Sequence, residues 1–203
     1  MLEVRALSRP GLAPVDLDLA AGEALALLGP SGSGKTLLLR AIADLDPNQG
    51  RVGLDGEDRE DVPAPTWRRR VTYLSAEPGW WAERAGEHFP DAKAAKALLP
   101  PLGLPEDMMA RPIAELSTGE RHRLALVRVL VQAPRVLLLD EPTTGLDQET
   151  TRAVEAVLRA RLADGAAILF STHDEALARR LGDRALRVRD GRVEESQAGE
   201  AAP

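Results

Sequence analysis

A Gly-rich segment near the N-terminus, GPSGSGKT at residues 29–36, constrains this chain more than any other feature. It fits the pattern G-x-x-x-x-G-K-[ST], in which glycines let successive backbone N–H groups converge on a phosphate. An apolar run at residues 24–28 precedes the segment, and a helical stretch at residues 36–45 follows it. An ordinary Gly/Ser turn before a helix is the alternative. The order of strand, loop and helix favours a phosphate-binding loop.

The residue types in this loop match the chemistry of a nucleoside triphosphate and its metal ion. Lys35 can reach the β- and γ-phosphates, and the hydroxyl of Thr36 can ligate Mg²⁺. The following helix adds the positive end of its dipole. The predicted phosphate-binding residues are Gly29, Pro30, Ser31, Gly32, Ser33, Gly34, Lys35 and Thr36.

Length and composition exclude several classes of protein. The 203 residues suit one domain with room for a small inserted subdomain, and the net charge of −6 argues against a nucleic-acid partner. The absence of cysteine excludes disulfides, thiol catalysis and cysteine metal sites. The first ten residues lack the apolar core of a secretion signal, and no apolar run approaches the roughly 18 residues of a membrane span. We therefore expect a soluble chain whose membrane role would need a partner.

Strands alternate with helices along most of the chain, which predicts an α/β fold with a mostly parallel sheet and an antiparallel N-terminal part. Residues 77–116 are rich in Pro and Ala, and we expect them to form a helical subdomain inserted into a single domain of residues 1–203. The tail after Glu195 is expected to be disordered. The expected strands are residues 2–7, 15–19, 24–28, 51–54, 71–74, 136–139 and 167–170 with a hairpin at 185–193, and the expected helices are 36–45, 119–132, 148–163 and 175–181.

An apolar run that ends in two acids, VLLLDE at residues 136–141, is the second chemical signal. Alone, it describes a buried parallel strand with charges at its exit. Because the carboxyl ends of parallel strands line the ligand crevice of an open sheet, we expect the two acids near the phosphate loop. Asp140 is predicted to belong to the Mg²⁺ shell, with Glu141 polarising the attacking water.

A third signal is LSTGE at residues 116–120, directly before a long predicted helix. Ser117 and Glu120 fit the S-x-x-E capping box, which is a structural role. The same helix N-terminus, formed by Ser117, Thr118, Gly119 and Glu120, offers free N–H groups and is a candidate second anion site. Two phosphate-binding sites in one chain suggest that nucleotides are held between two copies.

His173 follows the apolar run at residues 167–170 through Ser171 and Thr172. A single histidine is often structural or merely exposed. This one ends a predicted core strand in the chain that carries the other signals. We therefore predict that it donates a hydrogen bond in the γ-phosphate region.

These motifs together resemble those of ATP-binding cassette (ABC) ATPases. GPSGSGKT, LSTGE, VLLLDEP, TTGLD at residues 143–147 and STHD at residues 171–174 occur in the family's order. Gly119 and Asp140 are 21 positions apart, and Asp140 and His173 are 33 apart, as is typical of the family. The resemblance covers nearly the whole chain. Within the family the chain is most similar to small stand-alone bacterial cassettes, with the iron-efflux type as the suggested subtype.

The resemblance implies a function and partners. It implies a P-loop NTPase that binds ATP and Mg²⁺ in a head-to-tail homodimer, in which LSTGE of one copy closes on ATP held by GPSGSGKT of the other. It implies that Asp147 helps to form the dimer seam, and that Glu141, His173 and Lys35 serve hydrolysis. The cassette would energise a separate integral membrane permease from the cytoplasmic face of the cell membrane, where it would be a peripheral subunit. Substrate specificity would lie in the permease.

The chain departs from the family pattern at three places. Ala76 stands where a Gln that senses Mg²⁺ and faces the membrane partner is usual. Either the neighbouring Glu77 substitutes for it, which we favour, or the coupling is altered. Ser8-Arg9-Pro10 stands where an aromatic residue usually stacks on adenine, so Arg9 lying on the base and acceptance of GTP both stay open. The insert is short, and Trp80 and Trp81 within it are either core residues or an exposed docking anchor.

Two other functions remain as alternatives. One is a non-transport ABC ATPase that acts on ribosomes or DNA, although such proteins usually carry two cassettes, long coiled coils or basic surfaces. The other is a nucleotide-gated cassette with little turnover, which the missing Gln would allow. A phosphate-release assay distinguishes the second alternative from a transport ATPase.

Overall fold

The computed structural model describes residues 1–195, and the expected disorder after Glu195 lies outside them. In the described part, ten strands form a four-stranded sheet in the order β2-β1-β4-β5 and a six-stranded sheet in the order β10-β9-β3-β8-β7-β6. The strands are β1 (Leu2–Arg9), β2 (Leu12–Leu19), β3 (Ala24–Leu28), β4 (Gln49–Leu54), β5 (Glu57–Asp58), β6 (Val71–Leu74), β7 (Val136–Asp140), β8 (Ala167–Thr172), β9 (Arg184–Arg189) and β10 (Arg192–Glu195).

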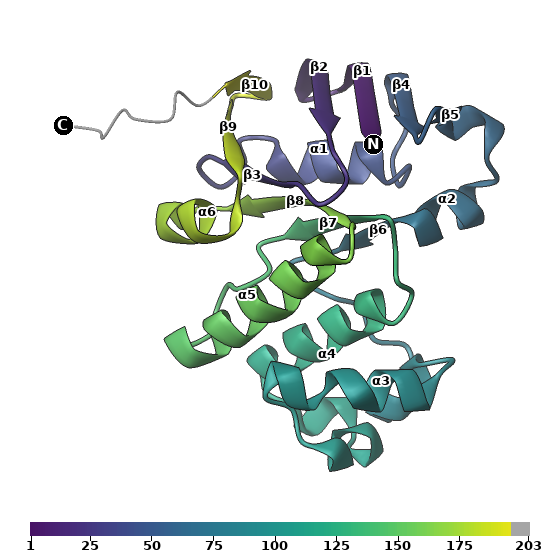
Figure 1. Cartoon of the computed structure of the whole chain (residues 1–203), viewed down its shortest axis with the longest axis vertical. Coiled ribbons are helices and arrows are strands. Elements are labelled where there is room, and N and C mark those ends of the chain that lie inside the picture. Colours follow the sequence, from purple (N-terminus) through teal and green to yellow (C-terminus); the bar gives the residue numbers. More distant parts are fainter. Residues whose placement is uncertain (196–203) are drawn as a thin grey trace.

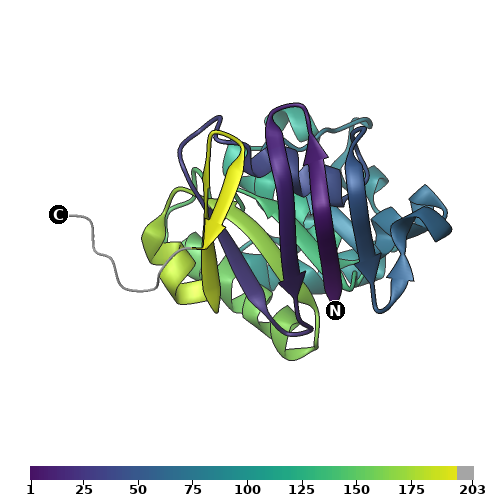
Figure 2. The same ribbon diagram turned by 90° about the horizontal axis from the view of Figure 1, so that it is seen from above.

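The α-helices are distributed on both sides of the larger sheet. Figure 1 shows α1 between the two sheets, with α3, α4 and α5 beneath the larger one, and Figure 2 shows β1, β2 and β4 from above. The helices are α1 (Lys35–Ile42), α2 (Ala64–Arg70), α3 (Ala92–Leu98), α4 (Thr118–Leu130), α5 (Gln148–Ala163) and α6 (Glu175–Leu181).

The larger sheet separates two hydrophobic cores because strand side chains alternate between its faces. On β3, Leu25 and Leu27 join the core that contains α1 and the N-terminal sheet, while Ala24, Ala26 and Leu28 join the core of α4, α5 and the insert. Strands β6, β7, β8, β3 and β9 run parallel, and β10 is antiparallel to β9. The predicted fold, with a mostly parallel sheet and an antiparallel N-terminal part, is confirmed.

The insert, expected as a helical subdomain at residues 77–116, contains helices, but most of them are short 3₁₀ segments rather than α-helices. It contains one short α-helix, α3, and four 3₁₀ segments within residues 85–115. Prolines explain the difference, since Pro removes a backbone donor and interrupts the i→i−4 pattern of an α-helix. Three of these 3₁₀ segments begin next to Pro100, Pro105 and Pro112.

Helix α1 ends three residues earlier than expected because side chains cap its C-terminus. Asp44 has a left-handed φ of 58°. The last carbonyls of the helix accept hydrogen bonds from the side chains of Asn48, Arg59 and Trp67. Arg59 donates to Ala41 O at 3.0 Å, and the Trp67 indole donates to Ile42 O at 3.0 Å. These bonds satisfy groups that a helix end leaves free. Trp67 lies on α2, a helix that the sequence analysis did not predict.

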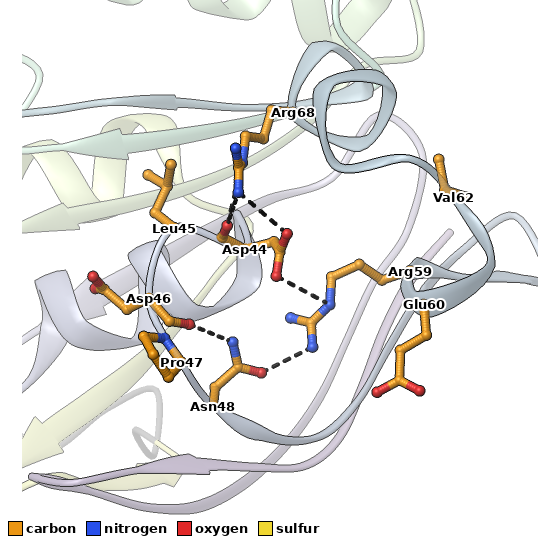
Figure 3. A pocket seen from close by; sticks show the side chains of 9 residues that line it. All are labelled: Asp44, Leu45, Asp46, Pro47, Asn48, Arg59, Glu60, Val62 and Arg68. Carbon is orange, nitrogen blue, oxygen red and sulfur yellow. Dashed lines mark hydrogen bonds and ion pairs between the residues drawn. The ribbon is translucent and has the colours of Figure 1, made fainter.

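Two of these capping residues, Asn48 and Arg59, border a cavity of about 520 Å³ (Figure 3). Arg59 is buried there and donates to Asn48 at 2.9 Å, while Asp44 is paired with both Arg59 and Arg68. Three of its charged side chains, those of Asp44, Arg59 and Arg68, are thus paired with one another. The cavity is formed by the cap of the phosphate-loop helix and lies at the opposite end of α1 from the loop itself.

We predict that Trp67→Phe lowers the free energy of unfolding by about 1–3 kcal/mol, because the fully buried Ile42 carbonyl loses its donor and the ring loses volume. Trp81→Phe is the matched control, since Trp81 is 71% exposed, and it should change stability by about 0.5 kcal/mol or less. Urea unfolding followed by circular dichroism measures both. Equal effects of the two substitutions would contradict the capping role.

Candidate nucleotide site

The phosphate loop is held open by glycine conformations and by its own lysine. Gly34 precedes α1 with a φ of 112°, and a side chain at Gly29 would overlap the carbonyl oxygen of Val188. The ammonium group of Lys35 donates to the carbonyl oxygens of Gly29 at 2.6 Å and of Pro30 at 2.9 Å. Lys35 therefore spans the loop at the place where the sequence predicts phosphate.

The turn between β9 and β10 supports this loop from behind. The N–H of Gly191 donates to Ser33 O at 2.8 Å, and the Gly191 carbonyl accepts from Ala13 N at 2.8 Å. The hydroxyl of Ser33 is buried and has no partner within the described chain. An orphaned hydroxyl inside a loop of this shape fits an anion as its missing partner.

Asp140 connects the loop to the two neighbouring strands. It lies at the end of β7, is 4% exposed, and accepts hydrogen bonds from three hydroxyl groups. Its Oδ2 accepts from Thr36 at 2.7 Å and from Tyr73 at 3.0 Å, and its Oδ1 accepts from Ser171 at 2.6 Å. A buried carboxylate requires such partners, so the hydroxyls fix its position beside the loop.

Thr36 and Asp140 form a donor set that suits Mg²⁺. Magnesium prefers hard oxygen ligands and typically takes one or two from the protein and the rest from phosphates and water. The hydroxyl of Thr36 and the carboxylate of Asp140, 2.7 Å apart at the mouth of the phosphate loop, provide these oxygens. The residues present therefore fit the predicted metal.

Glu141 follows Asp140 in a left-handed conformation, with a φ of 51°. Its N–H donates to Ser171 Oγ at 3.0 Å, and its Oε2 accepts from the Thr144 hydroxyl at 3.0 Å. The same oxygen lies 3.0 Å from Nδ1 of His173, whose side chain is 69% exposed. The structure therefore brings together Glu141 and His173, which the sequence predicts as catalytic residues.

The LSTGE segment lies at the N-terminus of α4 and not beside the phosphate loop. Ser117 caps α4: its Oγ accepts from Glu120 N at 3.2 Å, and Glu120 Oε2 accepts from Ser117 N at 2.8 Å. The capping box is therefore present, and hydrogen bonds from Ser117 lower the pKa of Glu120. Ser117 and Thr118 are exposed, and α4 packs on the opposite face of the sheet from α1. Asp147 caps α5, where backbone and side-chain bonds from Thr150 lower its pKa.

The structure shows the surroundings of Glu77 and Arg9, which lie at two of the departures from the family pattern. Glu77 is exposed, and in residues 1–195 its carboxylate makes no hydrogen bond or ion pair, so its role as a substitute stays a prediction. Arg9 is mostly buried and paired with Asp46, and Asp46 also accepts from Arg40 at 2.7 Å. These partners lower the pKa of Asp46 to about 2. The guanidinium of Arg9 is therefore engaged by a carboxylate in this structure.

The sequence analysis missed two hydroxyl residues at the site, Tyr73 and Ser171. Tyr73 lies in an apolar strand run and in none of the motifs, whereas Ser171 belongs to STHD, in which only His173 was given a role. Their proximity to Asp140 follows from strand register, in which Asp140 pairs with Ser171 and β6 runs beside β7. A parallel-sheet order of β6-β7-β8 would have indicated them, but the sequence alone did not give that order.

The fold and this loop define a P-loop nucleotide-binding protein, and comparisons with known proteins narrow the class. The ABC transporter family matches residues 12–144. The chain is 39% identical over 95% of its length to the Fe(3+) ions import ATP-binding protein FbpC of Streptomyces coelicolor and spans 59% of that protein. It is 43% identical over 93% of its length to the aliphatic sulfonates import ATP-binding protein SsuB 3 of Nocardia farcinica, spanning 74% of it. It is 38% identical over 91% of its length to the lipoprotein-releasing system ATP-binding protein LolD of Maricaulis maris, spanning 88% of it.

Solved structures agree with these relatives. The chain matches an ATP-binding subunit of an ABC transporter with a TM-score of 0.85 and 30% identity, covering 95% of this chain and 88% of the other. It matches a dimeric ATP-binding cassette, solved in a post-hydrolysis state with ADP and phosphate, with a TM-score of 0.83 and 25% identity, covering 98% and 100%. The chain belongs to the ABC transporter family. The family resemblance is confirmed, and the iron-efflux subtype stays a prediction.

No helix within residues 1–195 has the length and apolar character that crossing a bilayer requires.

We predict that Ser171→Ala weakens both the fold and ATP hydrolysis, because Asp140 loses a donor and the N–H of Glu141 loses its acceptor. The free energy of unfolding should fall by about 1–3 kcal/mol. Thr172→Val is the matched control: its hydroxyl is equally buried but accepts from Asp174 N at 3.0 Å instead. Urea unfolding and a phosphate-release assay compare the two. If Thr172→Val lost as much hydrolysis as Ser171→Ala, the role of Ser171 at the site would be wrong.

Proposed function

We propose that this chain is the ATP-hydrolysing subunit of an ABC transporter, which works as a homodimer and energises a separate membrane permease from the cytoplasmic face of the membrane. One observation carries this proposal: the phosphate loop, the Asp140–Glu141 pair and His173 meet at one end of the parallel sheet. The printed names of the relatives, which include import ATP-binding proteins and a lipoprotein-releasing ATP-binding protein, support a role in transport.

Each residue of the site has its own role in the transfer of the phosphoryl group to water. Lys35 and the N–H groups of the loop would bind the β- and γ-phosphates, and Thr36 and Asp140 would hold Mg²⁺. The bound metal would neutralise charge that develops on the phosphate oxygens. Glu141 accepts a proton from, and orients, the attacking water. His173, hydrogen-bonded to Glu141 in this structure, donates toward the γ-phosphate once nucleotide is present.

The second half of each site comes from another copy. The phosphate loop begins α1 in one core, whereas Ser117 begins α4 in the other core, with its N-terminus exposed. A helix N-terminus binds anions through free N–H groups and its dipole. A head-to-tail dimer places Ser117, Thr118, Gly119 and Glu120 of one copy on the phosphates held by the other. Asp147, exposed at the start of α5, lies at the seam.

The permease is proposed to dock on the insert beside Trp81. The rings of Trp80 and Trp81 flank the guanidinium of Arg128, whose carbon lies 4.7 and 4.8 Å from the two ring centroids. His88 contacts both rings edge-on. Trp80 packs against the core, whereas Trp81 is 71% exposed. Trp80 therefore fits the role of a core residue, and Trp81 fits the role of a docking anchor.

A nucleotide-gated cassette with little turnover is the second candidate function. Ala76 has no polar side chain to place beside the metal, and Glu77 is exposed. A phosphate-release assay on the purified chain separates the two candidates: steady release that requires Lys35 supports the ATPase, and release at the background rate supports the gated cassette.

We predict that Glu141→Gln traps an ATP-bound dimer, because the variant keeps the metal and phosphate ligands but cannot accept a proton from water. Its mass in gel filtration with light scattering should double when ATP and Mg²⁺ are added. The double variant Lys35→Ala/Glu141→Gln is the control and should stay monomeric. A Glu141→Gln protein that remains monomeric in saturating ATP contradicts the proposed dimer.

We predict that Trp81→Ala weakens co-purification with a permease encoded beside this gene about 10-fold or more, since exposed aromatic anchors dominate interface energies. Basal ATP hydrolysis should change much less. Trp81→Phe keeps an aromatic ring and should retain most of the binding. If Trp81→Ala assembled normally while its insert unfolded on its own in urea, Trp81 would be a core residue of the insert and not an anchor.

A further inference from the structure

Tyr73 contributes a hydroxyl to the predicted metal site from outside every motif discussed above. It lies on β6 opposite Leu138 of β7. Because side chains on a strand alternate, Asp140 shares a face with Leu138. The phenol is thus directed along that face, and its oxygen lies 3.0 Å from Asp140 Oδ2. Tyr73 is half-buried and packs against the core that contains α1.

The contacts of Asp140 show why this hydroxyl matters for its geometry. Ser171 donates to Oδ1, while Tyr73 and Thr36 both donate to Oδ2. Donors on both oxygens fix the rotation of the carboxylate plane. Thr36 is itself predicted to ligate the metal. Tyr73 and Ser171 are therefore the two contacts that orient Asp140 without being ligands.

The phenol can act here only as a donor. An ionised carboxylate can only accept hydrogen bonds, so the hydroxyl of the phenol is the donor in its 3.0 Å contact with Asp140. Hydrogen bonds that orient a metal-binding carboxylate raise the affinity of a site although the donor itself does not touch the metal. Losing such a donor typically lowers metal affinity about 10–100-fold.

We propose that Tyr73 is a positioning residue that holds Asp140 for the divalent metal bound with the nucleotide. This inference rests on the proposed function, in which Asp140 and Thr36 bind Mg²⁺. Tyr73 is the polar contact that β6 makes with the carboxylate, while Ala76, just beyond the strand, has no polar side chain to offer. The metal affinity of the nucleotide complex, rather than the chemical step, depends on the phenol.

The test uses the full chain with ADP and follows free Mn²⁺ by electron paramagnetic resonance, so that no turnover is involved. Tyr73→Phe removes only the hydroxyl and should weaken Mn²⁺ binding roughly 10-fold. In ATP hydrolysis it should raise the Mg²⁺ concentration for half-maximal rate by a similar factor and leave the rate at saturating Mg²⁺ close to that of the unchanged chain. Wild-type Mn²⁺ affinity in Tyr73→Phe, or a loss of hydrolysis that excess Mg²⁺ does not restore, overturns the inference.

A matched control separates positioning from stability. Thr72→Val removes the neighbouring hydroxyl of the same strand, which donates to Arg68 O at 3.0 Å and faces away from the site. It should leave Mn²⁺ affinity unchanged. Thermal unfolding checks that Tyr73→Phe stays folded, as expected for a change that removes one hydroxyl and keeps the ring packed against the core. An equal loss of Mn²⁺ affinity in Thr72→Val and in Tyr73→Phe overturns the positioning role.

Asp140→Asn distinguishes failure of this inference from failure of the proposed function. If Asp140→Asn binds Mn²⁺ as tightly as the unchanged chain, the metal site itself is wrong. If Asp140→Asn loses binding and Tyr73→Phe does not, only the role of Tyr73 is wrong. In the Asp140→Asn background Tyr73→Phe should have no further effect, because the phenol acts through that carboxylate. An additional loss in the double variant overturns the inference.

Discussion

The site depends on the hydrogen bonds that hold the buried carboxylate of Asp140. A carboxylate removed from water must be compensated by donors, and its donors come from the phosphate loop, from β6 and from β8. Ser171, one of these donors, also accepts from the N–H of Glu141. One buried charge therefore sets the position of the loop relative to three strands, and places Glu141 and His173 beside it.

The division of the chain into two cores determines what one copy can do alone. Alternation along the central strands sends Leu25 and Leu27 toward α1 and sends Ala24, Ala26 and Leu28 toward α4. The phosphate loop and the N-terminus of α4 are consequently built on opposite faces of one sheet. In the proposed dimer, the phosphate loop of one copy and the N-terminus of α4 of another would meet on one nucleotide, which explains why they can be built on opposite faces of the sheet in each copy.

Much of the fold could be predicted because local patterns agree with the tertiary structure. The bounds of β3, β6, α5 and α6 match the expected ranges, since apolar runs, Gly turns and Asp caps define them locally. The insert could not be predicted in detail, because closely spaced prolines favour short 3₁₀ segments whose packing is not local. At the site, the motifs indicated the loop, Asp140, Glu141 and His173. No motif contains Tyr73, and STHD contains Ser171 without indicating its contact with Asp140, because both contacts arise from strand register across the sheet.

The central claim is that each nucleotide is clasped by the phosphate loop of one copy and by Ser117 of another. Mixing two inactive variants, Lys35→Ala and Ser117→Arg, tests this most directly by phosphate release. Each variant should be inactive alone, whereas mixed dimers contain one intact pair of half-sites and should recover up to roughly a quarter of the normal rate. If the mixture stays inactive although mixed dimers are demonstrated, or if Ser117→Arg alone hydrolyses ATP normally, each copy completes its own site and the account is wrong.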